Sequence, residues 1–324
     1  MIEHGGNLAA AAQRYGIAPE EWLDLSTGVS PFGYPAQDIR PEIWRRLPSE
    51  PPAFRAAAAR YYGTRSFLPV PGSQAAIQLL PMLIAAQSVA VARPTYGEHA
   101  SVWARSGTIV EALPEEALVQ TARHDVVVLC NPNNPTGTLR SAAELRELWE
   151  RQSARRGWLV VDEAFIDTEP QCSVASHAGA DGLLVLRSMG KFFGLAGARV
   201  GFLFAPPQLL ENAAAAIGPW SVSGPALAVA TKALADAAFC SRVRKLLKVE
   251  STRLREILEK HGYPIAGATD FFAWVKHPRA RNIQERLARD GILIRAFDDP
   301  PSLRFGLAGS EAAWNRLEHS LGKL

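Results

Sequence analysis

The segment from Ser188 to Gly201 carries residue types suited to covalent chemistry with an aldehyde. Its sequence, SMGKFFGLAGARVG, places Lys191 three residues after Ser188 and eight before Arg199. The apolar run 182–186 before it is typical of a buried strand, so Lys191 is expected on the loop that leaves a sheet. Burial disfavours the charged form of a lysine, and a neutral amine can form a Schiff base. Because a hydroxyl and a guanidinium suit a phosphate, the segment predicts a pyridoxal phosphate site. The alternative is a solvated lysine beside a salt-bridged Arg199.

Short apolar strands alternate with helical patterns between about residues 71 and 205. Strands rich in Val and Leu between helices predict an α/β fold with a mostly parallel sheet buried on both faces. Ligands of such sheets bind beyond the carboxyl ends of the strands. The candidate strands are 88–92, 126–130, 158–161, 182–186 and 200–204, and the candidate helices are 74–86, 98–106, 141–155 and 207–216.

The rest of the chain predicts a second, smaller α+β domain. The Gly- and Pro-containing segment 218–225 interrupts the alternation, and a helical stretch with possible breaks covers 226–261. Strands are expected at 271–275 and 292–295, and helices at 282–290 and 311–321. We therefore predict a large cofactor-binding domain over 48–235, and a small domain that joins the N-terminal arm 1–47 to 236–324.

Polar and aromatic residues follow the first predicted strands. Gly72, Ser73 and Gln74 stand where a helix begins, and free backbone N–H groups there favour an anion such as phosphate; the alternative is a helix capped by Ser73. Tyr96 follows the strand 88–92, where its ring can stack on a flat heteroaromatic group or pack in the core.

Two further polar residues follow the next strands. The turn NPTG begins at Asn134, whose amide can donate to a phenolate oxygen, unless this is a plain Asn-Pro turn. Asp162 ends the strand 158–161, where a buried carboxylate needs a cation. A pyridinium nitrogen is such a cation, and His99 could orient the carboxylate from behind; the alternative is a Mg²⁺-binding aspartate. All these positions stand at strand ends, in the order phosphate turn, ring, Asn, Asp, Lys and Arg.

Composition excludes several other classes. The 324 residues carry a net charge of +3 with scattered arginines, so no nucleic-acid partner is expected. Three separated cysteines and seven histidines without HExxH spacing predict a reduced cytoplasmic protein with no metal site. No apolar run is long enough for a membrane span, and the first residues do not resemble a secretory signal.

The order Tyr96, Asn134, Asp162, Lys191, Arg199 resembles the fold-type I pyridoxal-phosphate aminotransferases, in the histidinol-phosphate aminotransferase-like branch. The resemblance implies that Lys191 forms the Schiff base, that Asp162 pairs with the pyridine nitrogen and Asn134 with the 3-oxygen, and that Tyr96 stacks on the ring. The residues that it implies for the cofactor phosphate are Gly72, Ser73, Ser188 and Arg199, and Gln74 is also expected to bind the cofactor. A homodimer is also implied.

Within this branch the chain is most similar to the L-threonine-O-3-phosphate decarboxylases of cobalamin biosynthesis. The similar segments are the opening HGGN at 4–7, the segment WLDLSTGVSP at 22–31 and the ending LRFGLAG at 303–309. The likeness implies Arg304 for the substrate carboxylate and Arg295, with His4 and Asn7, for its phosphate. Backbone N–H groups around Gly28 could also meet the carboxylate.

The sequence departs from the family at two positions. Phe165 stands where most aminotransferases have a tyrosine that bonds the 3-oxygen, and Leu47 stands near a tyrosine that reaches the partner subunit's cofactor. The first departure favours a decarboxylase over a generic aminotransferase. Three rivals stay open: a phosphate-substrate aminotransferase, a catalytically idle protein of the same fold, and a nicotinamide oxidoreductase, for which a GxGxxG turn is missing.

Overall fold

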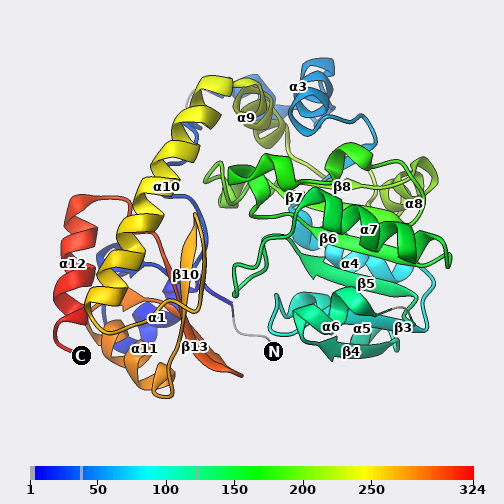
Figure 1. The fold of residues 1–324 in the computed structure, drawn as a ribbon. Coiled ribbons are helices and arrows are strands. Elements are labelled where there is room, and N and C mark those ends of the chain that lie inside the picture. The colour runs from blue at the N-terminus through cyan, green and yellow to red at the C-terminus, as the bar shows by residue number, and fades with distance from the viewer. Residues whose placement is uncertain (1–3, 37–38, 122) are drawn as a thin grey trace. The chain divides into compact units, whose positions relative to one another are not determined.

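The computed structural model describes residues 4–36, 39–121 and 123–324 (Figure 1). The chain divides into two compact units. The first holds the N-terminal residues up to Phe32 with Asn134–Thr138 and Val243–Leu324, and the second holds Gly33–Asn133 and Leu139–Arg242. We refer to them as the small and the large unit. The predicted domain boundaries at residues 48 and 235 stay a prediction.

The large unit is built on one seven-stranded sheet, in the order β2-β8-β7-β6-β5-β3-β4. Strand β8 pairs antiparallel with β2 and β7, and the other pairs are parallel, as predicted. The strands are β2 (Phe67–Val70), β3 (Ser88–Ala92), β4 (Ile109–Leu113), β5 (Val126–Cys130), β6 (Trp158–Asp162), β7 (Leu183–Ser188) and β8 (Gly201–Phe204).

These directions bring the candidate residues to one edge of the sheet. The carboxyl ends of β2, β3, β5, β6 and β7 share that edge, because these strands all run the same way. Strand β8 runs the opposite way, so its first residue, Gly201, lies at the same edge, two residues after Arg199. Because β8 is reversed, the residues that precede it lie at the same edge of the sheet as the residues that follow the other strands.

Helices flank this sheet (Figure 1). Val89, Val126, Val160 and Leu184 on neighbouring strands are fully buried, which agrees with a sheet covered on both faces. Strands β2 and β4 were not predicted, because Pro69 interrupts one run and β4 is largely exposed. The helices are α2 (Pro41–Arg45), α3 (Pro52–Tyr62), α4 (Ser73–Leu83), α5 (Glu98–Arg105), α6 (Glu115–Gln120), α7 (Ala142–Ser153), α8 (Pro207–Ile217) and α9 (Gly224–Ala235), with short 3₁₀ turns at Ile166–Thr168, Pro170–Cys172, Ala175–His177 and Ala196–Ala198.

The small unit centres on a four-stranded antiparallel sheet, in the order β12-β13-β10-β9. Its strands are β9 (Gly267–Thr269), β10 (Phe272–Lys276), β12 (Arg295–Asp298) and β13 (Pro301–Gly306); β1 (Leu23–Asp24) pairs with β11 (Ile292–Leu293). Its helices are α1 (Leu8–Tyr15), the 3₁₀ turn Pro19–Glu21, α11 (Ala280–Arg289) and α12 (Glu311–Leu321), and α10 (Ala237–Lys260) continues into it from the large unit.

The predicted helical stretch 226–261 is two helices. It breaks at Asp236, whose side chain accepts a hydrogen bond from the backbone N–H of Phe239 at 2.8 Å. An aspartate at this position favours a new helix start. Among the described residues, no helix combines the length and apolar character that crossing a bilayer requires.

Candidate active site

The turn after β2 is shaped for a close backbone approach. Gly72 has φ +79° and precedes the first residue of α4, and no side chain caps this helix end. The helix therefore begins with N–H groups that Ser73 does not cap, contrary to the alternative left open by the sequence. A Cβ atom on Gly72 would lie 2.4 Å from Nη2 of Arg199, so a side chain there would displace this guanidinium, and the positive φ also favours glycine. The structure brings Gly72 and Arg199 together at a helix N-terminus, which is an arrangement suited to phosphate.

The loop between β7 and β8 carries three of the predicted residues. Oγ of Ser188 accepts a hydrogen bond from the N–H of Gly190 at 3.2 Å, which tightens the turn before Lys191. Arg199 is exposed, has φ +53°, and donates from Nη1 to the carbonyl of Ala196 at 3.1 Å. Ser188 is opposite Gly201 in the β7–β8 pair, so both ends of the loop are fixed by the sheet.

Asp162 is a buried carboxylate at the end of β6. Its Oδ2 lies 2.9 Å from Nε2 of His99, and its Oδ1 accepts from the N–H of Ala164 at 3.0 Å. Burial lowers the pKa of His99, but the bond to Asp162 and nearby groups outweigh it and raise that pKa to about 10. The pair is therefore an imidazolium against a carboxylate at neutral pH. The hydrogen bond between His99 and Asp162 was expected from the sequence.

Cys130 belongs to the same buried cluster, which the sequence analysis missed. The ligating atoms of His99, Cys130 and Asp162 all lie within 4.8 Å of one another. Cys130 is opposite Asp162 in the β5–β6 pair, and that register could have indicated their proximity. Mg²⁺ prefers oxygen ligands, so a thiol and an imidazole beside the carboxylate do not favour the Mg²⁺ alternative.

Tyr96 is half-buried on the turn between β3 and α5. Its ring meets the ring of His99 edge to face, with centroids 5.9 Å apart. Its hydroxyl donates to Oε1 of Gln74 at 3.1 Å. Burial and the charge of Asp162 raise the pKa of Tyr96, so the hydroxyl keeps its proton. The structure thus brings Tyr96 and Gln74 together. Gln74 is the second residue of α4, and its side chain accepts a hydrogen bond from the Tyr96 hydroxyl.

Lys191 lies against an aromatic side chain. Its Nζ is 5.5 Å from the centroid of the Phe165 ring, and Phe165 is buried. Phe165, at which the sequence departs from most aminotransferases, is therefore a direct neighbour of the lysine amine.

A buried charged network lies next to these strand ends and was not predicted. Arg187 pairs with Asp167 and, at 3.2 Å, with Glu163. The Tyr61 hydroxyl donates to Asp167 at 2.8 Å. An arginine inside the Leu-rich run of β7 is the sequence signal that could have revealed it.

In the small unit, Arg304 is buried and holds two acceptors. Its Nη1 donates to Oδ1 of Asn134 and its Nη2 to the carbonyl of Ser26, both at 2.6 Å. Because Oδ1 of Asn134 faces the guanidinium, the amide nitrogen points another way. This orientation agrees with an amide that donates to a ligand. Gly28, two residues after Ser26, is also buried.

The two predicted substrate arginines are direct neighbours. Arg295 on β12 is paired with Arg304 on β13, and directly opposite residues of an antiparallel pair project from the same face. An anionic ligand that reaches both guanidinium groups would gain charge-assisted hydrogen bonds from each. The pairing joins residues that the sequence analysis assigned to the carboxylate and the phosphate of one substrate.

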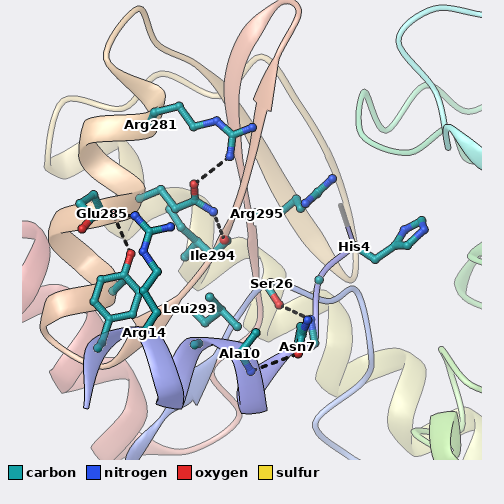
Figure 2. Close-up of a pocket in the computed structure, with 16 residues that line it drawn as sticks. His4, Asn7, Ala10, Arg14, Ser26, Arg281, Glu285, Leu293, Ile294 and Arg295 are labelled. Atoms are coloured by element: carbon teal, nitrogen blue, oxygen red, sulfur yellow. Dashed lines mark hydrogen bonds and ion pairs between the residues drawn. The ribbon is translucent and has the colours of Figure 1, made fainter. Parts of the chain in front are cut away.

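A pocket of about 850 Å³ in the small unit contains His4, Asn7 and Arg295 (Figure 2). Asn7 caps α1 by accepting from the N–H of Ala10 at 3.2 Å. Two other arginines that line the pocket form ion pairs with acidic side chains. Arg14 pairs with Glu285 at 2.8 Å, and Arg281, also on the wall, pairs with Asp298 at 2.7 Å. The three residues predicted to bind the substrate phosphate thus line one cavity.

A protein-family model and several known proteins are similar to this chain over most of its length. The family model "Aminotransferase class I and II" matches residues 41–321. The chain belongs to this family. It is 46% identical to a threonine-phosphate decarboxylase of Pseudomonas aeruginosa, over 99% of this chain and 97% of that protein. It is also 46% identical to a threonine-phosphate decarboxylase of Sinorhizobium sp, over 100% and 98%. A solved structure of histidinol-phosphate aminotransferase from Sinorhizobium meliloti, in complex with pyridoxal-5'-phosphate, superposes with a TM-score of 0.84 at 20% identity, covering 99% and 95% of the two chains.

The predicted fold, fold type I with a mostly parallel sheet and a small α+β part, is confirmed. The residues of the large unit also fit the cofactor that the family implies. Gly72 leaves room for a guanidinium at a helix N-terminus, Asp162 supplies a buried anion, and Lys191 supplies an amine. These donors match a phosphate, a pyridine nitrogen and an aldehyde.

Proposed function

We propose that this protein decarboxylates L-threonine O-3-phosphate to (R)-1-amino-2-propanol O-2-phosphate and CO2, with pyridoxal phosphate as cofactor, in cobalamin biosynthesis. The carrying observation is the direct pairing of Arg295 with Arg304 beside a pocket that also holds His4 and Asn7. A substrate with a carboxylate and a phosphate needs two cationic contacts. Two full-length relatives that bear the name threonine-phosphate decarboxylase support the same choice.

On the substrate side, Arg304 is assigned to the carboxylate. Its guanidinium is buried and oriented by Asn134 and Ser26, so a carboxylate meets a donor that is already positioned. Arg295, His4 and Asn7 are assigned to the phosphate. Arg14 and Arg281, which pair with Glu285 and Asp298, are assigned to the structure of the pocket wall.

On the cofactor side, residues of the large unit have separate tasks. Gly72, Ser73, Gln74, Ser188 and Arg199 hold the phosphate end, with the side chain of Gln74 also contacting Tyr96. Asp162 keeps the ring nitrogen protonated, because an opposite charge at close range favours the charged form. Tyr96 is assigned to stacking on the ring, and Asn134 is assigned to the 3-oxygen.

Decarboxylation breaks the bond between Cα and the carboxyl carbon, which leaves as CO2, and adds one proton at Cα. Bound pyridoxal phosphate supplies the electron sink that accepts the pair left on Cα. Arg304 fixes which bond of Cα is broken by fixing the carboxylate. Lys191 would hold the cofactor through its aldehyde carbon, and its Nζ would supply the proton that Cα takes up. We further propose a cytoplasmic homodimer.

The test supplies L-threonine O-3-phosphate to the purified holoenzyme without any keto acid. Release of CO2 and formation of aminopropanol phosphate are expected. Turnover that begins only when 2-oxoglutarate is added would instead identify an aminotransferase.

A matched pair of variants tests the substrate site. Arg295→Gln is expected to raise KM for threonine phosphate by about 10- to 150-fold, since a hydrogen bond to a charged group contributes about 1.5–3 kcal/mol. Arg281→Gln on the same pocket wall should change KM by about threefold at most, because its charge is already balanced by Asp298. If the two variants raise KM equally, the assignment of the substrate phosphate to Arg295 is wrong. Light scattering on the eluting holoenzyme tests the homodimer, and a monomer mass would exclude it.

A further inference from the structure

A chain of hydrogen bonds runs from Glu98 to the hydroxyl of Tyr96. Oε2 of Glu98, the first residue of α5, accepts from Nε2 of Gln74 at 2.9 Å and from Nε2 of Gln78 at 3.2 Å. Oε1 of Gln74 accepts from the Tyr96 hydroxyl at 3.1 Å. All these residues belong to the large unit, on α4, on α5 and on the turn before α5.

The direction of these bonds is set by the group at the end of the chain. An ionised carboxylate only accepts hydrogen bonds, whereas a glutamine amide has one accepting and one donating end. Glu98 therefore requires the NH₂ end of Gln74, and the carbonyl end of Gln74 must face Tyr96. Tyr96 then donates its hydroxyl proton to Gln74.

Gln78 makes the same argument from the other side. Its Oε1 accepts from Nη2 of Arg105 at 2.7 Å, and an arginine only donates. Arg105 thus requires the carbonyl end of Gln78, which leaves its NH₂ end for Glu98. Glu98 therefore accepts a hydrogen bond from the NH₂ group of each glutamine. The carbonyl end of Gln74 faces Tyr96, and the carbonyl end of Gln78 faces Arg105.

We propose that Glu98 is a positioning residue for Tyr96, acting through Gln74 to fix the direction of the tyrosine hydroxyl bond. The inference rests on the proposed function, which places the Tyr96 ring against the cofactor. With its proton directed at Gln74, the hydroxyl presents lone pairs elsewhere, and a ligand group that meets it must be a donor. The hydrogen bond to Gln74 also restricts the movement of the Tyr96 side chain.

The electrostatics agree with this coupling. Burial is the main cause that raises the pKa of Tyr96, and the charges of Asp162 and Glu98 raise it further. The negative charge of Glu98 thus opposes ionisation of the phenol and helps to keep the proton that Gln74 accepts.

The test is a double-mutant cycle between Glu98→Gln and Tyr96→Phe. Glutamine at position 98 keeps the size of the side chain but can present either end to Gln74, so the direction is no longer imposed. The dissociation constant of pyridoxal phosphate is measured on protein freed of cofactor by dialysis, and kcat and KM for threonine phosphate are measured on the holoenzyme. Glu98→Gln alone should weaken cofactor binding about 3- to 10-fold, the value of one hydrogen bond. In the Tyr96→Phe background it should change binding by less than about twofold.

Gln78→Ala is the matched control, because it removes a partner of Glu98 and keeps Gln74, which accepts the hydrogen bond of the Tyr96 hydroxyl. It should leave the cofactor dissociation constant within about twofold of the wild type. If Glu98→Gln has the same effect with and without the Tyr96 hydroxyl, Glu98 is only structural and the inference is overturned. If Tyr96→Phe weakens binding and Glu98→Gln does not, the inference fails while the proposed function stands. If Tyr96→Phe and Tyr96→Leu both leave cofactor binding unchanged, the ring is not at the cofactor, and the inference fails because its premise in the proposed function is wrong.

Discussion

Replacing Gly72 by alanine tests whether the turn after β2 holds the cofactor phosphate. Gly72 has φ +79°, and an added Cβ would lie 2.4 Å from Nη2 of Arg199 and 2.9 Å from its Cζ. Two effects are therefore expected. The backbone becomes strained, and the Arg199 guanidinium must move away from the helix start.

The two effects have different sizes and different consequences. A non-glycine residue in a sparsely populated backbone region costs about 1–3 kcal/mol of folding stability. A displaced guanidinium loses a charge-assisted phosphate contact, which is a loss of about 1.5–3 kcal/mol in binding, or about 10- to 150-fold in the dissociation constant. The second effect is seen only with the cofactor present.

Gly107→Ala separates strain from displacement. Gly107 has φ +83°, but no atom lies within 4 Å of the Cβ that it would acquire. Both variants should lose stability in urea denaturation of the cofactor-free protein. Only Gly72→Ala should weaken pyridoxal phosphate binding, measured by absorbance titration of the same protein. A Gly72→Ala protein that binds the cofactor as tightly as the wild type, or a Gly107→Ala protein that binds it equally weakly, would refute the assignment of this turn to the phosphate.

Further changes have defined outcomes. Lys191→Ala should leave no pyridoxyl adduct after borohydride reduction, as seen by mass spectrometry, and should reduce turnover by more than about 100-fold; an adduct on another lysine would disprove its role. In Arg304→Lys, the ammonium group cannot hold a carboxylate with two parallel hydrogen bonds, and the bond from the guanidinium to Asn134 is lost. The value of kcat/KM for threonine phosphate should therefore fall about 10- to 150-fold. An unchanged value would show that another residue binds the carboxylate. His99→Asn tests the raised pKa of His99: the native state holds an extra proton between pH 6.5 and about 10, so the stability advantage of the wild type is full below pH 6.5 and declines by up to about 1.4 kcal/mol per pH unit as pH rises through that window. Urea titrations of both proteins over pH 6–10 measure the difference, and a constant difference would show that Asp162 does not hold the imidazolium.

Much of the large unit could be predicted from the sequence, because its central strands are buried on both faces and read as continuous Val and Leu runs. The strands at Ser88–Ala92 and Val126–Cys130 were predicted at their observed bounds. The edge strand Ile109–Leu113 was missed, since an exposed edge needs no apolar run. In the small unit, Pro301–Gly306 was missed because it begins with proline and carries the buried Arg304, which tertiary contacts with Asn134 and Ser26 satisfy.

Site residues at strand ends were predictable because a parallel sheet collects the carboxyl ends of its strands. Relations between residues were less accessible. The register that sets Arg295 opposite Arg304 depends on the turn between two short strands. The link from Glu98 to Tyr96 depends on how two helices pack, and nothing in the spacing of these residues specifies it. Sequence order therefore indicated which residue types are present at the site, whereas hydrogen-bond directions required coordinates.

The reversed strand β8 has a consequence for how the site can change. A single connection leaves β7 after Ser188, passes through Lys191 and Arg199, and re-enters the neighbouring strand at Gly201. The amine and the guanidinium are thus tethered to each other by one peptide segment anchored at both ends. Inserting or deleting a residue there would shift one group relative to the other, whereas point substitutions elsewhere along the same edge can alter substrate choice and leave their spacing intact.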